Sequence, residues 1–142
     1  MQAATAMDTR TNTAAAGSSF KLVDKSDLAP GLFALYFDMP GEKVNKLSGQ
    51  TLPELESILD GLKSRSDVKA LVLLSSKETI FIAGADINII QSIKTKEDGM
   101  KMASTGQAIL QKFEDFKFPV VAAIHGACMG GGTELALCCK YI

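Results

Sequence analysis

The feature that most constrains this chain is an apolar segment that runs into a glycine turn and then into helix-forming residues. Residues 120–124 are β-branched or small, Gly130, Gly131 and Gly132 follow, and Glu134 falls in the first turn of the helix expected next. A strand that leads through glycines into a helix N-terminus exposes backbone N–H groups, and the helix dipole adds positive potential there. Donors that can hold a negative oxygen, with a carboxylate close by, favour a site that activates a carbonyl group.

A second apolar segment ends in the same way. Residues 80–82 lead into Ala83 and Gly84, and Asp86 can cap a helix that follows. If both segments are parallel strands, their carboxyl ends lie at the edge of a sheet where ligands gather. Two N–H groups that converge there would form an oxyanion hole. Two tight strand-to-helix connections, with small residues for packing, explain the same spacing.

The polar residues near these turns have structural explanations beside catalytic ones. Glu134 is favoured as a carboxylate by the helix dipole, which suits a general base, but acids are also common in the first turn for helix stability. Asp86 is more typical of a helix cap than of a catalyst. His125, the only histidine, is more typical of a structural residue, and no nucleophile elbow accompanies it.

Glycine turns also bind phosphates, but this one lacks the spacing that phosphate binding requires. The motif G-x-x-x-x-G-K-[ST] does not occur, and residues 126–130 do not fit G-x-G-x-x-G. Recognition of a nucleotide phosphate by this turn is therefore disfavoured.

The hydrophobic pattern along the rest of the chain predicts an α/β fold with a mainly parallel sheet. Strand-like segments alternate with helical ones, which is typical of βαβ crossovers. Strands are expected at residues 20–23, 31–37, 68–75, 80–82 and 120–124, and helices at residues 51–62 and 95–115 and after Gly132. At residues 51–54, Thr-Leu-Pro-Glu predicts a capping box with proline in the first turn.

Composition limits the function classes. The chain has 142 residues, 46% of them hydrophobic and 22% charged, which is enough for the core of one domain. A net charge of −1 with scattered basic residues argues against binding to a nucleic-acid backbone. The longest apolar run is far shorter than the roughly 20 residues that span a bilayer. Residues 1–19 have no apolar h-region and a single arginine, which predicts a disordered tail instead of a signal or transit peptide.

The three cysteines, Cys128, Cys138 and Cys139, have spacings that match no metal-binding signature, and no metal site is predicted. Free thiols in a reducing compartment are the main interpretation. A reactive thiol at Cys128, beside the glycine turn, is the alternative.

Two segments resemble the signature motifs of the crotonase (enoyl-CoA hydratase/isomerase) superfamily. They are residues 81–88, Phe-Ile-Ala-Gly-Ala-Asp-Ile-Asn, and residues 119–136, which begin Pro-Val-Val-Ala-Ala and end Gly-Gly-Gly-Thr-Glu-Leu-Ala. More narrowly, these motifs and residues 43–48 are similar to the N-terminal hydratase part of the multifunctional fatty-acid β-oxidation α subunit. The resemblance implies a crotonase-like fold of ββα repeats, truncated at the C-terminus, in a domain that spans residues 20–142.

The resemblance implies a role for each matching residue. It places the oxyanion hole at the N–H groups of Ala83 and Gly131, which would hold the thioester oxygen of a 2-enoyl-CoA. It makes Glu134 the residue that activates water for syn addition, and Ala85 would meet the adenine of coenzyme A. The substrate-binding residues that it implies are Ala83, Gly84, Ala85, Asp86, Gly130 and Gly131. Coenzyme A enters as part of the substrate, and no separate cofactor is implied.

The resemblance also implies that the chain is an N-terminal fragment. The family's second catalytic glutamate would lie beyond Ile142, as would the rest of the hydratase core and the dehydrogenase portion of the α subunit. We therefore expect little or no hydratase activity from this chain alone. The alternatives are a Δ3-Δ2 enoyl-CoA isomerase, which needs one proton shuttle, a non-catalytic acyl-CoA-binding fragment, or a truncated gene model.

The expected partner is an acyl-CoA thioester, with no nucleic acid and no membrane span. The resemblance implies that the intact protein forms a homo-oligomer or a complex with a thiolase β subunit, in the cytoplasm or, alternatively, in the mitochondrial matrix. An exposed apolar face is expected where later strands and helices would pack.

Overall fold

The computed structural model describes residues 17–142, so most of the predicted tail, residues 1–16, lies outside the described part. The predicted tail also included Ser18 and Ser19, and here the prediction is corrected. Ser19 is buried, and its backbone N–H donates to the Glu54 carboxylate at 3.1 Å. Ordered structure therefore begins before the first strand.

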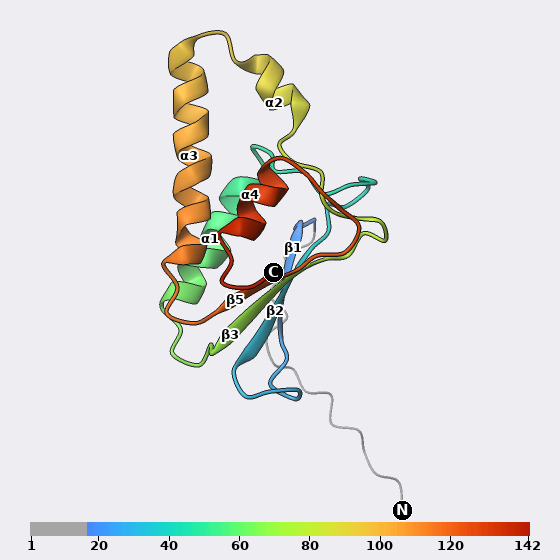
Figure 1. The fold of residues 1–142 in the computed structure, drawn as a ribbon, viewed down its shortest axis with the longest axis vertical. Helices are drawn as coiled ribbons and strands as arrows, with labels where there is room; N and C mark the ends of the chain where they lie inside the picture. Colours follow the sequence, from blue (N-terminus) through green and yellow to red (C-terminus); the bar gives the residue numbers. More distant parts are fainter. Residues whose placement is uncertain (1–16) are drawn as a thin grey trace, which may run out of the picture.

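The main sheet has four strands in the order β1-β2-β3-β5 (Figure 1). Strand β1 (Phe20–Asp24) pairs antiparallel with β2 (Leu32–Phe37), and β2 pairs parallel with β3 (Ala70–Ser75). Strand β5 (Val120–Ala123) pairs parallel with the other edge of β3. The prediction of an α/β fold with a mainly parallel sheet is thus confirmed.

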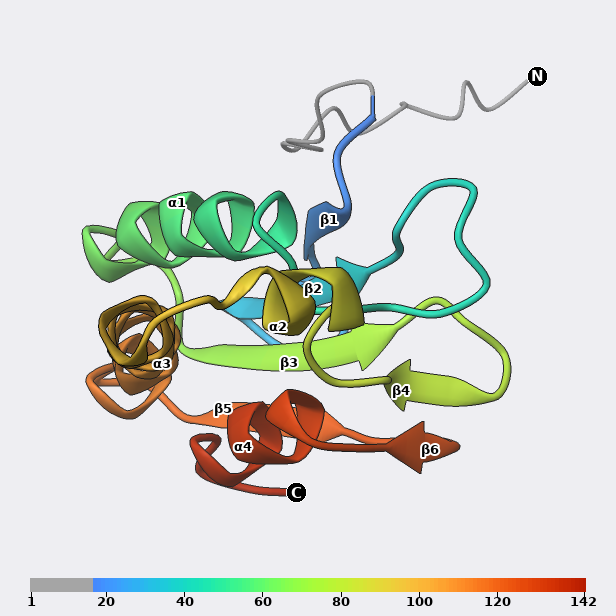
Figure 2. The same ribbon diagram turned by 90° about the horizontal axis from the view of Figure 1, so that it is seen from above.

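A second, two-stranded sheet continues from the carboxyl ends of the main strands (Figure 2). It joins β4 (Ile80–Ile82) in parallel to β6 (Ala127–Cys128). Only β4 was predicted, because a two-residue strand leaves no periodicity in the sequence. This pairing brings together the chain segments that lead into the two turns.

The helices are α1 (Thr51–Lys63), α2 (Ile87–Ser92), α3 (Lys96–Glu114) and α4 (Gly131–Leu137). Helices α1, α3 and α4 lie on the same side of the main sheet (Figure 1). Alternate strand residues point toward them because side chains of a strand alternate between its faces. The buried side chains of this single core include Phe33, Leu35, Phe37, Leu71, Leu73, Val120 and Ala122 from the sheet, and Leu55, Leu59, Leu62, Ile109, Phe113, Leu135 and Ala136 from the helices.

Helix α3 extends beyond the sheet, and α2 folds back from its free end (Figure 1). The buried residues of α3, Ile109, Leu110 and Phe113, all lie in its C-terminal half, and α2 has no buried residue. The exposed part of α3 begins with a capping box between Thr95 and Asp98. None of the helices within residues 17–142 is both long and apolar enough to cross a membrane.

The capping box predicted at residues 51–54 is wrong. Gln50 precedes α1 without a side-chain cap, and the Glu54 carboxylate instead accepts the N–H groups of Ser19 and Phe20, each at 3.1 Å, and the Ser18 hydroxyl. The N-terminal ends of β1 and α1 meet, so Glu54 satisfies backbone donors of the edge strand instead of donors of its own helix. That partner lies more than 30 residues away in the sequence, outside any local motif.

Candidate active site

The two turns found in the sequence lie side by side at the ends of β4 and β6. Ile82 pairs with Cys128, and the Met129 N–H donates to the Ile82 carbonyl at 3.0 Å. A Cβ atom placed on Gly84 would lie 3.2 Å from the Met129 carbonyl oxygen and 3.7 Å from the Gly131 nitrogen. Glycine at position 84 therefore allows the two backbones to touch.

The first turn, residues 83–86, is bound by the loop that precedes α1. The Leu47 N–H donates to the Gly84 carbonyl at 2.8 Å, and the Asp86 N–H donates to the Leu47 carbonyl at 2.9 Å, which makes a parallel bridge between Leu47 and Ala85. In such a bridge Leu47 makes its hydrogen bonds to the two neighbours of Ala85, and the N–H of Ala85 itself therefore faces away from Leu47. Within residues 17–142 the Ala85 N–H has no acceptor.

The assignment of Ala83 as a donor of the oxyanion hole needs correction. The Ala83 N–H already donates to the Asn45 carbonyl at 2.8 Å, so a ligand would have to displace a backbone hydrogen bond to use it. The N–H of Ala85 has no such acceptor, and the Ala85 nitrogen would lie 3.8 Å from a Cβ placed on Gly131 in the second turn. The sequence could not distinguish the two amides, because the distinction depends on the pairing with residues 45–47.

The second turn, residues 129–132, is shaped by close packing. Gly130 has a φ of +50°, and Gly132 fits against Ile82, whose Cβ would lie 2.7 Å from a Cβ placed on Gly132. The N–H groups of Gly132 and Thr133 donate to the carbonyls of Met129 and Gly130, each at 2.9 Å. The Gly131 N–H has no acceptor in the described part of the chain.

The two free N–H groups are close together. A Cβ placed on Gly131 would lie 3.8 Å from the Ala85 nitrogen. Glu134 follows in the first turn of α4, and its side chain is exposed, with no hydrogen bond or ion pair to another residue of the described range. The arrangement therefore places two unpartnered donors at two touching turns, and the second turn leads directly into the helix whose first turn carries Glu134.

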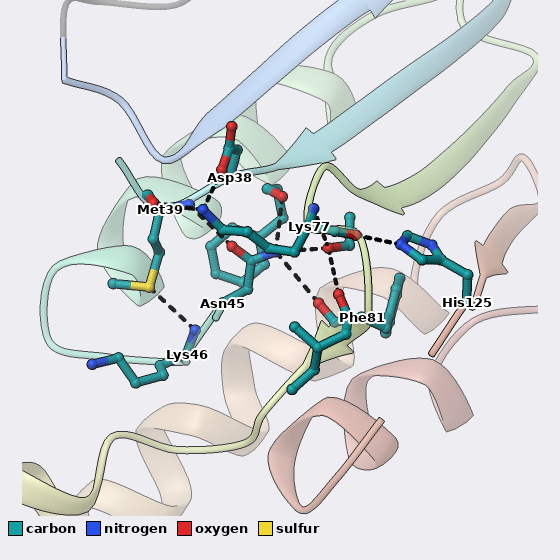
Figure 3. Close-up of polar contacts among 10 residues, drawn as sticks. Asp38, Met39, Asn45, Lys46, Lys77, Phe81 and His125 are labelled. Carbon is teal, nitrogen blue, oxygen red and sulfur yellow. Dashed lines mark hydrogen bonds and ion pairs between the residues drawn. The ribbon is translucent and has the colours of Figure 1, made fainter. Parts of the chain in front are cut away.

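The other predicted site residues have structural roles. Asp86 caps α2, since its carboxylate accepts the Asn88 N–H at 2.9 Å, and it lies 3.5 Å from the Lys46 ammonium. The pKa of Asp86 is lowered, first by the Asn88 N–H and then by Lys46. His125 is exposed, with Nε2 2.5 Å from the Lys77 carbonyl oxygen (Figure 3).

The cysteines are free thiols. Burial raises the pKa of Cys139 to about 12 and also raises that of Cys138, so both stay protonated at neutral pH. Cys128, on β6, is half-buried. Among the described residues no group of three or more His, Cys, Asp and Glu side chains is placed to hold a metal ion.

A cavity of about 560 Å³ lies away from the two turns, between the end of α3 and the residues that follow α4. Phe116, Phe118 and Leu137 contribute to its walls, and Leu137, Tyr141 and Ile142 are exposed apolar side chains. The predicted exposed apolar face is therefore present at this end of the molecule. At the turns, Ala85 and Gly130 are exposed, whereas Gly84 and Gly132 are buried.

Comparison with known proteins identifies the family of this chain. Residues 30–142 match the family model described as enoyl-CoA hydratase/isomerase. The chain is 44% identical over 121 residues to the fatty acid oxidation complex subunit alpha of Shewanella amazonensis, and 42% identical over 123 residues to that of Shewanella oneidensis. These matches cover 85% and 87% of this chain but 17% of each relative.

Solved structures show the same fold. An enoyl-CoA hydratase from Bacillus anthracis superposes with a TM-score of 0.76 at 27% identity, over 87% of this chain and 46% of that protein. DspI from Pseudomonas aeruginosa superposes with a TM-score of 0.74 at 26% identity, over 86% of this chain and 47% of that protein. The chain belongs to the enoyl-CoA hydratase/isomerase family.

Proposed function

We propose that this chain is the N-terminal portion of an enoyl-CoA hydratase that acts in fatty-acid β-oxidation. The observation that carries the proposal is the pair of unpartnered N–H groups, of Ala85 and Gly131, at two touching turns. Family membership and the names of the relatives support the same reaction class. The relatives are named as subunits of a complex, which supports the expectation that the whole protein works in an assembly.

In the proposed reaction the thioester oxygen of a 2-enoyl-CoA accepts hydrogen bonds from Ala85 and Gly131. When water adds to the β-carbon, electron density moves through the α-carbon to that oxygen, which becomes enolate-like. The two donors stabilise this charge, and each well-aimed donor is worth roughly 100- to 1000-fold in rate. Glu134, unengaged by other described residues, would accept the proton of the attacking water.

Turnover of crotonyl-CoA by the 142-residue chain tests the proposal. We expect thioester binding but a rate far below that of a complete family member, since one exposed carboxylate has to serve both proton transfers. Glu134→Gln should remove the remaining turnover and leave binding unchanged. A rate near that of a complete hydratase would contradict the predicted inactivity, and absence of thioester binding would contradict the proposed function.

A 3-enoyl-CoA substrate separates the second candidate, a Δ3-Δ2 isomerase. That reaction needs a single group to move a proton between two carbons, and Glu134, in the first turn of α4, is one carboxylate with no hydrogen bond to another described residue. Isomerisation that clearly exceeds hydration would favour this candidate. Binding without either reaction would favour a non-catalytic acyl-CoA-binding role.

A further inference from the structure

Asn45 is a fully buried polar side chain in the loop between β2 and α1. A buried amide is costly unless its donors and acceptor are satisfied. Its Nδ2 donates to the Phe37 carbonyl at 2.8 Å, to the Ser75 hydroxyl at 3.0 Å and, at 3.4 Å, to the Phe81 carbonyl. Its Oδ1 accepts the Met39 N–H at 3.0 Å. All its hydrogen-bonding groups are engaged.

These contacts join three strands at the edge where the site lies (Figure 3). Phe37 and Ser75 are the last residues of β2 and β3, and Phe81 lies in β4. The connection is reinforced by Ser75, whose hydroxyl donates to the Ile80 carbonyl at 2.7 Å. It is reinforced again by Lys77, whose ammonium donates to the Met39 carbonyl at 2.8 Å.

The backbone of the same loop holds the first turn of the site. The Asn45 carbonyl accepts the Ala83 N–H, and two residues later Leu47 bonds to both neighbours of Ala85. The Ala85 N–H is thereby turned away from Leu47, and its nitrogen lies close to Gly131. The side chain of Asn45 fixes the loop to the strand ends, and the loop sets the direction of the Ala85 N–H.

We propose that Asn45 is a positioning residue for the oxyanion hole, and that it acts on the Ala85 donor and not on the Gly131 donor. The inference rests on the proposed function, because it requires that Ala85 and Gly131 bind a thioester oxygen. Small displacements of an aligned donor have large effects, since a misplacement of about 1 Å can lower a rate by roughly 100-fold. Gly131 lies in a turn held by hydrogen bonds that do not involve the loop, from the Met129 N–H to Ile82 and from the Gly132 N–H to Met129, so its direction depends less on Asn45.

The test uses the amide signals of Ala85 and Gly131 in the 142-residue chain, observed by NMR while crotonyl-CoA is added. In the original chain both amide protons should move downfield, because both donate to the thioester oxygen. Asn45→Asp keeps the side-chain shape but removes both donors. In this variant the chemical-shift change of the Ala85 amide on addition of crotonyl-CoA should shrink severalfold, and that of the Gly131 amide should persist. The Kd for crotonyl-CoA should rise roughly tenfold, as for loss of one well-aimed hydrogen bond.

Glu54→Ala is the matched control. It removes a carboxylate that accepts backbone bonds from Ser19 and Phe20 and makes none to residues 83–86 or to Asn45, so it destabilises the chain without removing a contact of the first turn. The ligand-induced chemical-shift changes of the Ala85 and Gly131 amides should both remain in this variant. A merely structural role of Asn45 would instead reduce the Ala85 and Gly131 chemical-shift changes equally in Asn45→Asp.

The outcomes separate the two proposals. If crotonyl-CoA changes the chemical shift of neither amide in the original chain, the proposed function is overturned. If both chemical-shift changes occur in the original chain and the Ala85 change is unaltered in folded Asn45→Asp, the positioning role alone is overturned. If Asn45→Asp does not fold, Ser75→Ala decides the matter, because it removes one of the contacts of Asn45. The chemical-shift change of the Ala85 amide should then fall by a smaller factor than in Asn45→Asp. An unaltered change would overturn the positioning role of Asn45.

Discussion

The two turns of the site carry equivalent donors but are held in place by different interactions. Residues 83–86 are held by hydrogen bonds from a loop about 40 residues earlier in the chain, through Asn45 and Leu47. Residues 129–132 are held mainly by contact, because Gly132 lies against Ile82 and Gly131 against Leu47, and by one hydrogen bond from the Met129 N–H to the Ile82 carbonyl. The first turn therefore depends on distant polar partners, and the second depends on the absence of side chains.

This difference predicts which changes each turn tolerates. A turn held by hydrogen bonds loses its direction when one of its polar partners is removed. A packed turn is insensitive to distant polar changes but cannot accept a methyl group, since neither neighbouring backbone can move away without disturbing the sheet. Leu47 contacts both turns, through its backbone and its side chain, and links them into one site.

The largest effect is expected for Gly132→Ala. The added Cβ would lie 2.7 Å from the Ile82 Cβ and 2.8 Å from its carbonyl oxygen, so α4 has to shift away from β4. Overpacking of this kind usually lowers the free energy of unfolding by 1–3 kcal/mol, and contact with backbone favours roughly 3 kcal/mol. Urea unfolding measures the change, and binding of crotonyl-CoA should be lost with it.

Gly61→Ala is the control for that substitution. Gly61 lies within α1, and nothing is within 4 Å of an added Cβ, so alanine should raise the free energy of unfolding by roughly 0.5–1 kcal/mol. Equal stability of Gly132→Ala and the original chain would show that the second turn is not held by packing.

The second turn was predictable from sequence because its signals are local. An apolar run, three consecutive glycines and helix formers specify a strand, a turn and a helix without reference to the rest of the chain. The cap at Asp86 is local in the same sense, since its carboxylate accepts from Asn88, two residues away. These expectations agree with the structure.

The first turn was predicted in place but not in detail. The choice between Ala83 and Ala85 as donor depends on pairing with Asn45 and Leu47, and periodicity does not reveal such a nonlocal pairing. The misassigned capping box has the same cause, because Glu54 finds its partners on a strand distant in sequence. In the sequence a buried asparagine such as Asn45 looks like any loop residue, and its burial and its bonds to the strand ends are visible only in the structure.

An intermediate effect is expected for Gly84→Ala in the first turn. Gly84 has a φ of +106°, and the nearest atom to an added Cβ, the Met129 carbonyl oxygen, would lie at 3.2 Å. We expect the free energy of unfolding to fall by roughly 2 kcal/mol, from backbone strain together with a tight contact. Urea unfolding measures the change in the free energy of unfolding, and the chemical-shift change of the Ala85 amide on addition of crotonyl-CoA reports on the site.

Gly41→Ala separates the two causes. Gly41 has a φ of +73° but nothing within 4 Å of an added Cβ, so its alanine variant should show the strain alone, roughly 1 kcal/mol. The difference between the two variants is then the contact between the turns. If Gly41→Ala is as destabilising as Gly84→Ala, that contact contributes nothing and the turns are independent.

The smallest effect is expected from acid, which should loosen the first turn and leave the second unchanged. The pKa of Asp86 is lowered in the folded chain by the Asn88 N–H and by Lys46, so its contribution to stability is present above the ordinary aspartate pKa of about 3.9. It is lost as the pH falls through the lowered value, when the carboxylate takes up a proton and no longer accepts from Asn88. The Asn88 amide signal should therefore titrate with a midpoint below that of an ordinary aspartate, while the Gly132 amide, which donates to Met129, should not follow it.

Asp86→Asn should abolish this titration and keep α2 capped, because asparagine is an equally good cap. Asp98, whose pKa is lowered mainly by Thr95 at the start of α3, should continue to titrate in that variant. A Gly132 amide that titrates together with Asn88 would show that the two turns are coupled through Leu47 more tightly than their separate anchors imply.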